Sequence, residues 1–228
     1  MAPAFTKLKF SLASDALFHF FNNQYWSSEE ITFIRNFSDD SDNAHKLKLR
    51  LLCEENNDII VAAVLADSAS DELTFLRDRY LKHFSFVKIS MKLHIHPNGL
   101  QRWRDKILTD IASLLEYKLP MSDIFSRNKI EALIIVLERT IVFHETCRDF
   151  DRKFLTSLKI KLHFYQNLLF KLKQFLTSDS SRVGVKIIQA KIFNPRVSNE
   201  ELEKFFGVSH TTISRYIRLF QQNFFPNF

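Results

Sequence analysis

Histidine and cysteine are among the residue types in this chain that could bind a metal or act on a substrate, but their spacing indicates neither a metal site nor a catalytic site. His94 and His96, with His83 nearby, have no cysteine or carboxylate at ligand spacing, so we expect no metal site and no cofactor. His144 and Cys147 lie one helical turn apart, but the sequence shows no third group to orient them and no oxyanion site. We therefore expect no enzymatic activity from these residues.

The aspartates do not predict a nuclease or recombinase site either. Such enzymes bring carboxylates together around metal ions, whereas the aspartates here fall in polar loops and at helix starts, with no strands to make them converge. We expect them to solvate loops and cap helices: Asp39, Asp40, Asp67, Asp71 and Asp78. The phosphate-binding patterns GxxxxGK[ST] and GxGxxG are also missing from the sequence.

The composition favours a globular, all-α protein. Of the 228 residues, 46% are hydrophobic, enough for at least one sizeable core, while three glycines and five prolines leave little material for tight turns. The formal charge of +6 favours partners of negative charge. Cys53 and Cys147 lie outside any CxxC spacing, which predicts reduced, partly buried thiols in a cytoplasmic protein. We expect neither an export signal nor a membrane span.

The N-terminal region, residues 1–70, is rich in phenylalanine and is expected to be irregular as far as residue 43, with one exception. A short helix should begin at Ser27, where Glu30 completes a capping box. Two further short helices are expected in AHKLKLRLLCEE and DIIVAAVLADS, with NND as the break between them. The next helix is expected to have Asp71 as its cap.

Three more regions follow in the predicted organisation. A first module at 71–119 contains three helices, divided at Phe84–Ser85 and at HPNG, of which the last is long and amphipathic. Residues 120–177 form a helical segment. The polar stretch TSDSSRVG, closed by Gly184, is expected to be the linker to a C-terminal module at 185–228.

The helical segment at 120–177 carries a heptad pattern. Its apolar seam recurs at spacings of three and four: Leu155, Leu158, Leu162, Tyr165, Leu169, Leu172 and Leu176. An upstream stripe has the same character: Ile130, Ile134, Leu137 and Ile141. The polar HETCRDFD between them favours a helical hairpin over one long helix at 127–177. The seam suits a helix pair within one chain and a homodimer through 155–176 equally well.

One framework of apolar residues occurs twice, with an offset of 113 residues. SFVKISMKLHIHPNGLQRWR (85–104) and SNEELEKFFGVSHTTISRYI (198–217) each begin with a serine that can cap a short helix. The matched positions are Ile89 with Leu202, Leu93 with Phe206, Ile95 with Val208, Leu100 with Ile213, and Trp103 with Tyr216. A helix-turn-helix needs this pattern, because apolar residues on both sides of its turn pack inward while the second helix keeps a polar outer face.

The turn between the two helices requires a residue with a positive φ angle. Gly207 supplies it in the second copy, whereas His94 stands at the equivalent position of the first. Pro97 suits the first position of a helix, but Gly99 weakens that helix slightly. The C-terminal copy is therefore the better match to a helix-turn-helix.

The C-terminal copy resembles the helix-turn-helix of bacterial DNA-binding regulators, with VSHTTISRYI similar to their recognition helix. FLRDRYLKHFSFVKISMKLHIHPNGLQRWRDKIL (75–108) resembles the sigma-region-4-like module of small phage and low-GC bacterial regulators. Together the likenesses cover about a third of the chain and identify a superfamily of domains. They imply a cytoplasmic transcriptional regulator that binds double-stranded DNA through two helix-turn-helix modules.

The resemblance implies that the start and outer face of each second helix approach base edges in a major groove. Arg215 is then the strongest candidate for a bidentate contact to guanine. In the C-terminal copy the implied DNA-binding residues are Ser209, His210, Thr211, Ser214 and Arg215, with Arg218 facing phosphate. In the first copy they are His96, Asn98, Gln101 and Arg102, with Arg104 and Lys106 as phosphate contacts.

Other functions stay open on the sequence alone. The chain could be an oligomeric DNA-packaging or assembly adaptor with weak sequence preference, in which the heptad helices build the oligomer. It could be a sigma-like subunit that works with RNA polymerase, although no polymerase-binding domain is recognisable before residue 71. Either helix-turn-helix could also be a protein-interaction surface or a structural end cap. An enzyme acting on DNA would need clustered carboxylates that the sequence does not show.

Overall fold

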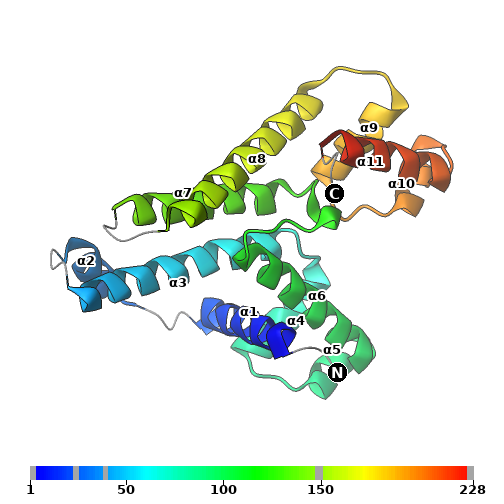
Figure 1. The fold of residues 1–228 in the computed structure, drawn as a ribbon. Helices are drawn as coiled ribbons and strands as arrows, with labels where there is room; N and C mark the ends of the chain where they lie inside the picture. The colour runs from blue at the N-terminus through cyan, green and yellow to red at the C-terminus, as the bar shows by residue number, and fades with distance from the viewer. Residues whose placement is uncertain (1–3, 23–25, 38–40, 147–150, 225–228) are drawn as a thin grey trace.

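The structure is a computed structural model that describes residues 4–22, 26–37, 41–146 and 151–224, and within these ranges it is all helical (Figure 1). The predicted all-α class is thus confirmed. The helices are α1 Ala4–Asn22, α2 Ser28–Asn36, α3 Asp42–Ala66, α4 Ser70–Leu76, α5 Phe86–Leu93, α6 Pro97–Leu115, α7 Arg127–Thr146, α8 Arg152–Thr177, α9 Val183–Phe193, α10 Asn199–Phe206 and α11 His210–Phe224. A π-helical turn, η1 Arg77–Leu81, continues α4, and a short 3₁₀ turn, η2 Met121–Asp123, precedes α7.

The N-terminal segment is a helix, so the expectation of an irregular chain as far as residue 43 is wrong. Ala13, Ala16 and Leu17 are fully buried on one face of α1 and pack against α3, α6 and η1. Their spacing of three and one is that of a helix stripe, but two of the three residues are alanines. The abundant phenylalanines around them hide this pattern. The capping box of Ser27 and Glu30 at the start of α2 is present as predicted.

The two short helices expected between residues 44 and 68 are one helix, α3. The predicted break at NND does not form, because Asn56 faces the protein interior and donates from Nδ2 to Thr140 Oγ1 of α7 over 3.3 Å. An asparagine or aspartate inside a helix costs roughly 0.5 kcal/mol relative to alanine, and a tertiary contact can offset that cost. Asp71 is likewise not a cap: Ala69 holds that position, and its backbone N–H donates to the Glu72 carboxylate over 3.1 Å.

The heptad seam is buried within the single chain. Helices α7 and α8 are separate and lie against each other (Figure 1), and Leu155, Leu158 and Leu172 of the seam belong to the main core. Tyr165 adds a polar anchor, because its hydroxyl accepts from Leu119 N and donates to Tyr117 O, both over 3.1 Å. The face that the sequence also offered for a homodimer is thus occupied by other parts of the same chain.

Two clusters of buried side chains form the interior. The main core collects residues from α1 and α3 to α8 together with Ile188 and Ile192 of α9 and Phe220 of α11. A smaller one joins Ile187, Leu202 and Ile213 from α9, α10 and α11. The C-terminal helices are nevertheless fixed to the body, since Phe220 of α11 lies against Phe125, with ring centroids 5.1 Å apart. Figure 1 shows α9, α10 and α11 together at one end of the molecule.

Two local details differ from the sequence-based expectations. Cys53 carries a free thiol and is exposed on α3, more than the sequence predicted, although neighbouring groups bury one side of the thiol and raise its pKa. Cys147 lies outside the described residues. Gly184 is the second residue of α9 and not the end of a linker, which stops at Arg182. In the described ranges no helix combines the length and apolar character that crossing a bilayer requires.

Candidate nucleic-acid interface

Two helix pairs with matching local geometry stand 113 residues apart, α5 with α6 and α10 with α11. Each first helix has eight residues and begins at a serine cap. Ser85 Oγ accepts from Lys88 N over 3.2 Å, and Ser198 Oγ accepts from Glu201 N over 3.1 Å. Both caps were predicted, and each fixes the direction in which the chain enters its first helix.

The turns between the paired helices are also equivalent. His94 has a φ angle of 54° and Gly207 one of 64°, both in the left-handed region, so the positive φ expected at this position is present in both copies. A Cβ added at Gly207 would meet no atom within 4 Å. The requirement there is therefore conformational and not steric. In the first copy Ser90 Oγ donates to Ile95 O over 2.6 Å and stabilises the less favourable turn.

The residues predicted to face inward do so, with one exception. Ile89, Leu100, Leu202 and Ile213 are buried at the helix–helix contacts. Tyr216 is exposed to 36%, so the expectation that it lies inside is wrong. Its ring lies against the backbone of α9 at Gly184, where an added Cβ would come within 2.6 Å of two ring carbons. The absence of a side chain at Gly184 thus lets the tyrosine lie along the outside of α9.

The outer face of α11 is open and cationic. Its exposed residues include Thr211, Arg215 and Arg218, and neither arginine forms an ion pair with any residue that the structure describes. The helix contains no aspartate or glutamate. It packs on α9 and α10 and reaches the body of the protein through Phe220. An anion that approaches the outer face therefore meets positive charge without a competing carboxylate on the same helix.

Four of the predicted residues on the C-terminal copy are engaged in local contacts, among them Thr211, whose Oγ1 lies 2.9 Å from Ser209 Oγ. Ser209 Oγ accepts from Thr212 N over 3.4 Å and so caps the start of α11. Asn199 Nδ2 donates to Ser214 Oγ over 3.3 Å and lies 3.4 Å from His210 Nε2. Ser209 and His210 are still exposed, whereas Ser214 is half-buried against α10. Thr211, Arg215 and Arg218 remain as the side chains that project without such contacts to α10.

In the first copy, some of the predicted polar residues form contacts within α6. Asn98, Arg102 and Lys106 are exposed on α6 at intervals of four residues. His96 is exposed and caps α6, since its Nδ1 accepts from Asn98 N over 3.2 Å. The other two predicted residues turn toward Asp105, on the same helix: Gln101 Nε2 donates to Asp105 Oδ1 over 2.8 Å, and Arg104 Nε lies 3.6 Å from the same atom.

Different numbers of neighbouring helices cover α6 and α11, although the two helices match in their apolar pattern. α6 is covered by α1, α3, α4 and α5, whereas α11 contacts chiefly α9 and α10. α6 also carries two aspartates, Asp105 and Asp110. The second helix of the C-terminal copy is therefore more exposed and less acidic than that of the first.

Helix α8, which precedes the C-terminal helices in the chain, is basic. It was not predicted from the sequence as part of a nucleic-acid interface. It contains no acidic residue, and its cations are Arg152, Lys153, Lys159, Lys161, Lys171 and Lys173. Lys159 pairs with Glu145 over 2.7 Å, and Lys173 lies 4.0 Å from Glu131. The signal was available in the sequence as a 26-residue stretch without aspartate or glutamate.

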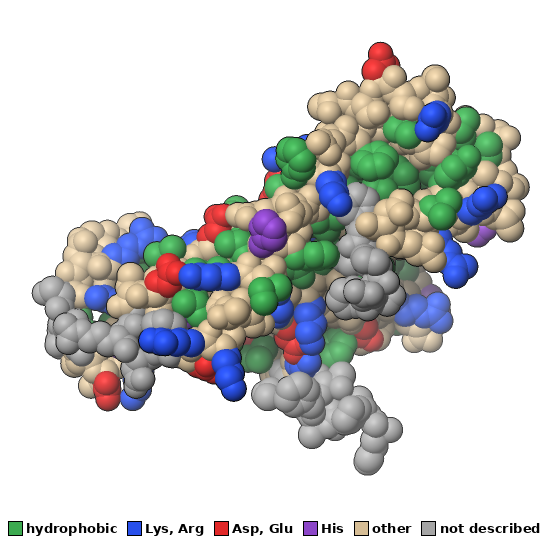
Figure 2. Space-filling view, turned by 45° about the horizontal axis from the view of Figure 1, so that its top comes forward, with side chains coloured by type: hydrophobic (Ala, Val, Ile, Leu, Met, Phe, Trp, Pro, Cys, Tyr) green, Lys and Arg blue, Asp and Glu red, His purple; other side chains and the backbone are tan. Residues whose placement is uncertain are grey.

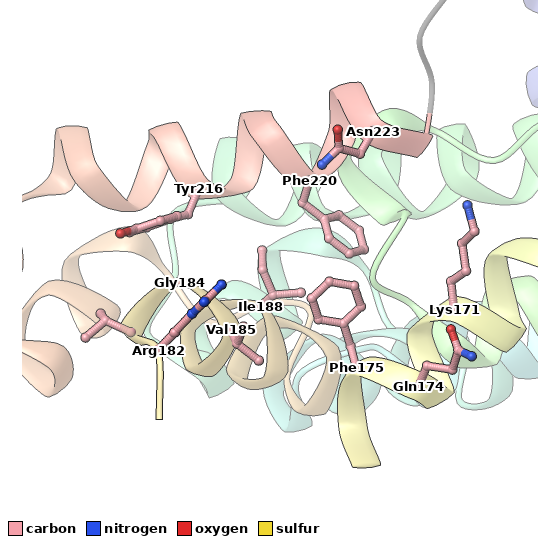
Figure 3. A pocket seen from close by; sticks show the side chains of 11 residues that line it. Lys171, Gln174, Phe175, Arg182, Gly184, Val185, Ile188, Tyr216, Phe220 and Asn223 are labelled. Atoms are coloured by element: carbon pink, nitrogen blue, oxygen red, sulfur yellow. The ribbon is translucent and has the colours of Figure 1, made fainter. Parts of the chain in front are cut away.

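The end of α8 also forms one wall of a cavity with α9 and α11 (Figure 3). Its volume is about 700 Å³, and Phe175, Ile188 and Phe220 lie in its middle. Figure 2 shows hydrophobic side chains gathered over the C-terminal helices, with Lys and Arg side chains around them. This cavity could not be predicted from the sequence, because its walls come from three segments that only the fold brings together.

No group of three or more potential metal ligands forms within the described part of the chain. Comparison with known protein families, with curated proteins and with solved structures finds no match for this chain.

Proposed function

We propose that the protein is a sequence-specific DNA-binding transcriptional regulator of the cytoplasm, in which α11 enters the major groove and reads base edges. The observation that carries this proposal is the outer face of α11. That face is open, it bears Thr211, Arg215 and Arg218, and no carboxylate of the same helix competes with DNA phosphates for the arginines. A major groove of B-DNA is wide enough to admit one α-helix.

The spacing of these residues suits that role. Positions 211, 215 and 218 are separated by four and three residues, so the side chains share one face of α11. The forked guanidinium of Arg215 matches the O6 and N7 acceptors of guanine, and Arg218, one turn further on, is suited to a phosphate. The helix start at Ser209 and His210 brings the positive end of the helix dipole to the same side.

The small core under α11 supports the proposal. Ile187, Leu202 and Ile213 hold the three C-terminal helices together without using the outer face of α11. Seven lysines and arginines against three glutamates between Arg182 and Phe224 give this unit a positive charge. Charge of this sign supplies salt-dependent affinity for DNA in general, while the reading face supplies sequence choice.

The first helix pair would be a second, weaker contact. Asn98, Arg102 and Lys106 face outward on α6, but Asp105 holds Gln101 and lies beside Arg104. We assign the main reading role to α11 for this reason, with α6 as an additional contact to the DNA backbone.

The dependence of DNA binding on salt tests this function. We expect the affinity for duplex DNA, measured by fluorescence anisotropy, to fall steeply as salt rises, with each phosphate contact contributing about 0.9 to the logarithmic slope. Arg218→Ala should reduce that slope by about one. Arg152→Ala is the matched control, because Arg152 is exposed at the far end of α8, about 39 Å along that helix from the C-terminal unit. An affinity indifferent to salt, or an equal loss in both variants, would contradict the proposal.

A further inference from the structure

The cavity between α8, α9 and α11 has the size and walls of a small-molecule site. Its volume of about 700 Å³ lies within the range of roughly 300–1,000 Å³ that is typical of ligand pockets. Phe175 of α8, Ile188 of α9 and Phe220 of α11 face one another across it (Figure 3). An apolar body bound there would contact all three helices at once and would replace water at aromatic and aliphatic surfaces.

The polar groups of this cavity are all suited to an anion. Lys171 and Arg182 lie at opposite ends of it, Gln174 and Asn223 add amide donors, and none of the described residues that line it is an aspartate or glutamate (Figure 3). Arg182 forms no ion pair with any residue in the described ranges. Its guanidinium is therefore available to pair with a carboxylate in a bidentate contact.

The first turn of α9 adds to this preference. Arg182 is the N-cap of α9, and its side chain does not cap the helix. Residues 182–185 line the cavity, so the first turn of this eleven-residue helix lies at its edge. Arg182 N donates to Ser180 Oγ over 3.3 Å and Val185 N to Arg182 O over 3.0 Å, which leaves the backbone N–H groups of Val183 and Gly184 without such a bond among the described residues. Such groups, together with the positive end of the helix dipole, favour an anion at the same place as Arg182 does.

One wall of the cavity depends on a glycine. A Cβ at Gly184 would come within 2.6 Å of Tyr216 Cδ1 and Cε1. Because no side chain is present there, the Tyr216 ring lies along α9 and closes one side of the cavity. The tyrosine belongs to α11, so a ligand in the cavity would touch the helix whose opposite face carries Arg215 and Arg218.

We propose that this cavity binds a small amphiphilic monoanion, whose carboxylate pairs with Arg182 at the start of α9 and whose apolar body packs among Phe175, Ile188 and Phe220. The binding site itself does not depend on DNA binding. Its consequence does rest on the proposed function: a ligand that contacts Tyr216 and Phe220 biases the position of α11 and so changes the affinity for DNA.

Binding of decanoate to the full chain, measured by calorimetry without DNA, tests the site. We expect one decanoate per chain, and weaker binding of decan-1-ol and of decyltrimethylammonium, which share the tail but lack the negative charge. Arg182→Gln should weaken decanoate binding about fivefold and leave decan-1-ol binding unchanged. Lys186→Gln is the matched control, because Lys186 is exposed on α9 but does not line the cavity. Equal binding of the three probes, or an equal loss in both variants, would overturn the proposal.

A second variant tests the location without relying on charge. Val185 lines the cavity, so Val185→Trp should fill part of it and abolish binding of both decanoate and decan-1-ol. Circular dichroism and the unfolding midpoint show whether this variant is folded, and if it is not, Arg182→Gln decides alone. Retained binding in folded Val185→Trp would overturn the proposal.

The effect on DNA is measured last, so that the two proposals fail separately. Decanoate should change the DNA affinity of the wild type but not that of Val185→Trp. Decanoate binding without any DNA binding would contradict the proposed function and leave the site in place. DNA binding that is identical with and without bound decanoate would overturn the coupling.

Discussion

His94 and Gly207 adopt the same left-handed backbone conformation at equivalent positions of two helix pairs, with φ angles of 54° and 64°. Each residue follows an eight-residue helix that begins at a serine cap. Glycine adopts this conformation without a steric penalty, whereas a residue with a Cβ is strained by roughly 1–2 kcal/mol. The two copies therefore share one geometry, but only the C-terminal copy has the residue that favours it.

This difference predicts that His94→Gly stabilises the protein. The side chain of His94 is exposed, so its removal costs little, and the relief of strain should raise the free energy of unfolding by about 0.5–1 kcal/mol. His94→Ala is the control, because alanine keeps the Cβ and the strain. Chemical denaturation measures both variants. If His94→Ala stabilised the protein as much as His94→Gly, the backbone explanation would be wrong.

A buried carboxylate of η1, next to the first helix pair, predicts a pH dependence of stability. Asp78 is exposed to only 1% and accepts from Lys82 Nζ over 2.8 Å and from Lys92 Nζ of α5 over 2.6 Å. Burial alone would raise the pKa of Asp78, but the hydrogen bonds and charges of the two lysines outweigh it and hold the pKa below the ordinary value of 3.8. Its stabilising contribution is therefore present above that value and is lost as the pH falls through the lower, folded-state pKa.

Asp78→Asn should therefore lower the free energy of unfolding by about 2 kcal/mol near neutral pH. The difference from the wild type should shrink as the pH falls from 3.8, where the unfolded chain begins to bind the proton, and should be lost below the lower folded-state pKa, where Asp78 of the native protein is protonated as well. Asp179→Asn is the control, since Asp179 is exposed between α8 and α9. Denaturation at several pH values measures all three proteins. A loss in Asp78→Asn that stays constant down to the most acidic condition would refute the assignment.

The contact between Gly184 and Tyr216 predicts a strong coupling between the two positions. Gly184→Ala places a Cβ within 2.6 Å of the tyrosine ring, so we expect a loss of about 1–3 kcal/mol in unfolding free energy. In the Tyr216→Ala background the same substitution should cost less than about 0.5 kcal/mol, because the ring is gone. A double-mutant cycle in chemical denaturant measures the coupling. Equal costs in both backgrounds would mean that the ring does not lie against α9.

The sequence predicted best those features that depend on neighbouring residues. Ser85 and Ser198 cap their helices, and Gly207 takes a positive φ, because cap and turn chemistry acts over three or four positions. The all-α class could also be predicted, because the chain contains few of the residues that form tight turns.

Features that depend on distant residues could not be predicted. α3 runs through NND because Asn56 is hydrogen-bonded to Thr140, 84 residues away. Tyr216 turns outward because Gly184, in another helix, leaves room for its ring. The apolar residues of α6 and α11 have similar spacing in the sequence. Only the fold shows that α1, α3, α4 and α5 cover α6, while the outer face of α11 stays open.

The measurement that tests the central claim most directly is selection of bound fragments from a pool of random duplex DNA. The wild type, Arg215→Ala and Arg102→Ala are compared under the same salt conditions. We predict that the wild type selects a defined sequence, that Arg215→Ala relaxes one position of it at a cost of about 1–3 kcal/mol, and that Arg102→Ala keeps the sequence. No selected sequence with the wild type, or a sequence altered by Arg102→Ala and unchanged by Arg215→Ala, would contradict the assignment of α11 as the reading helix.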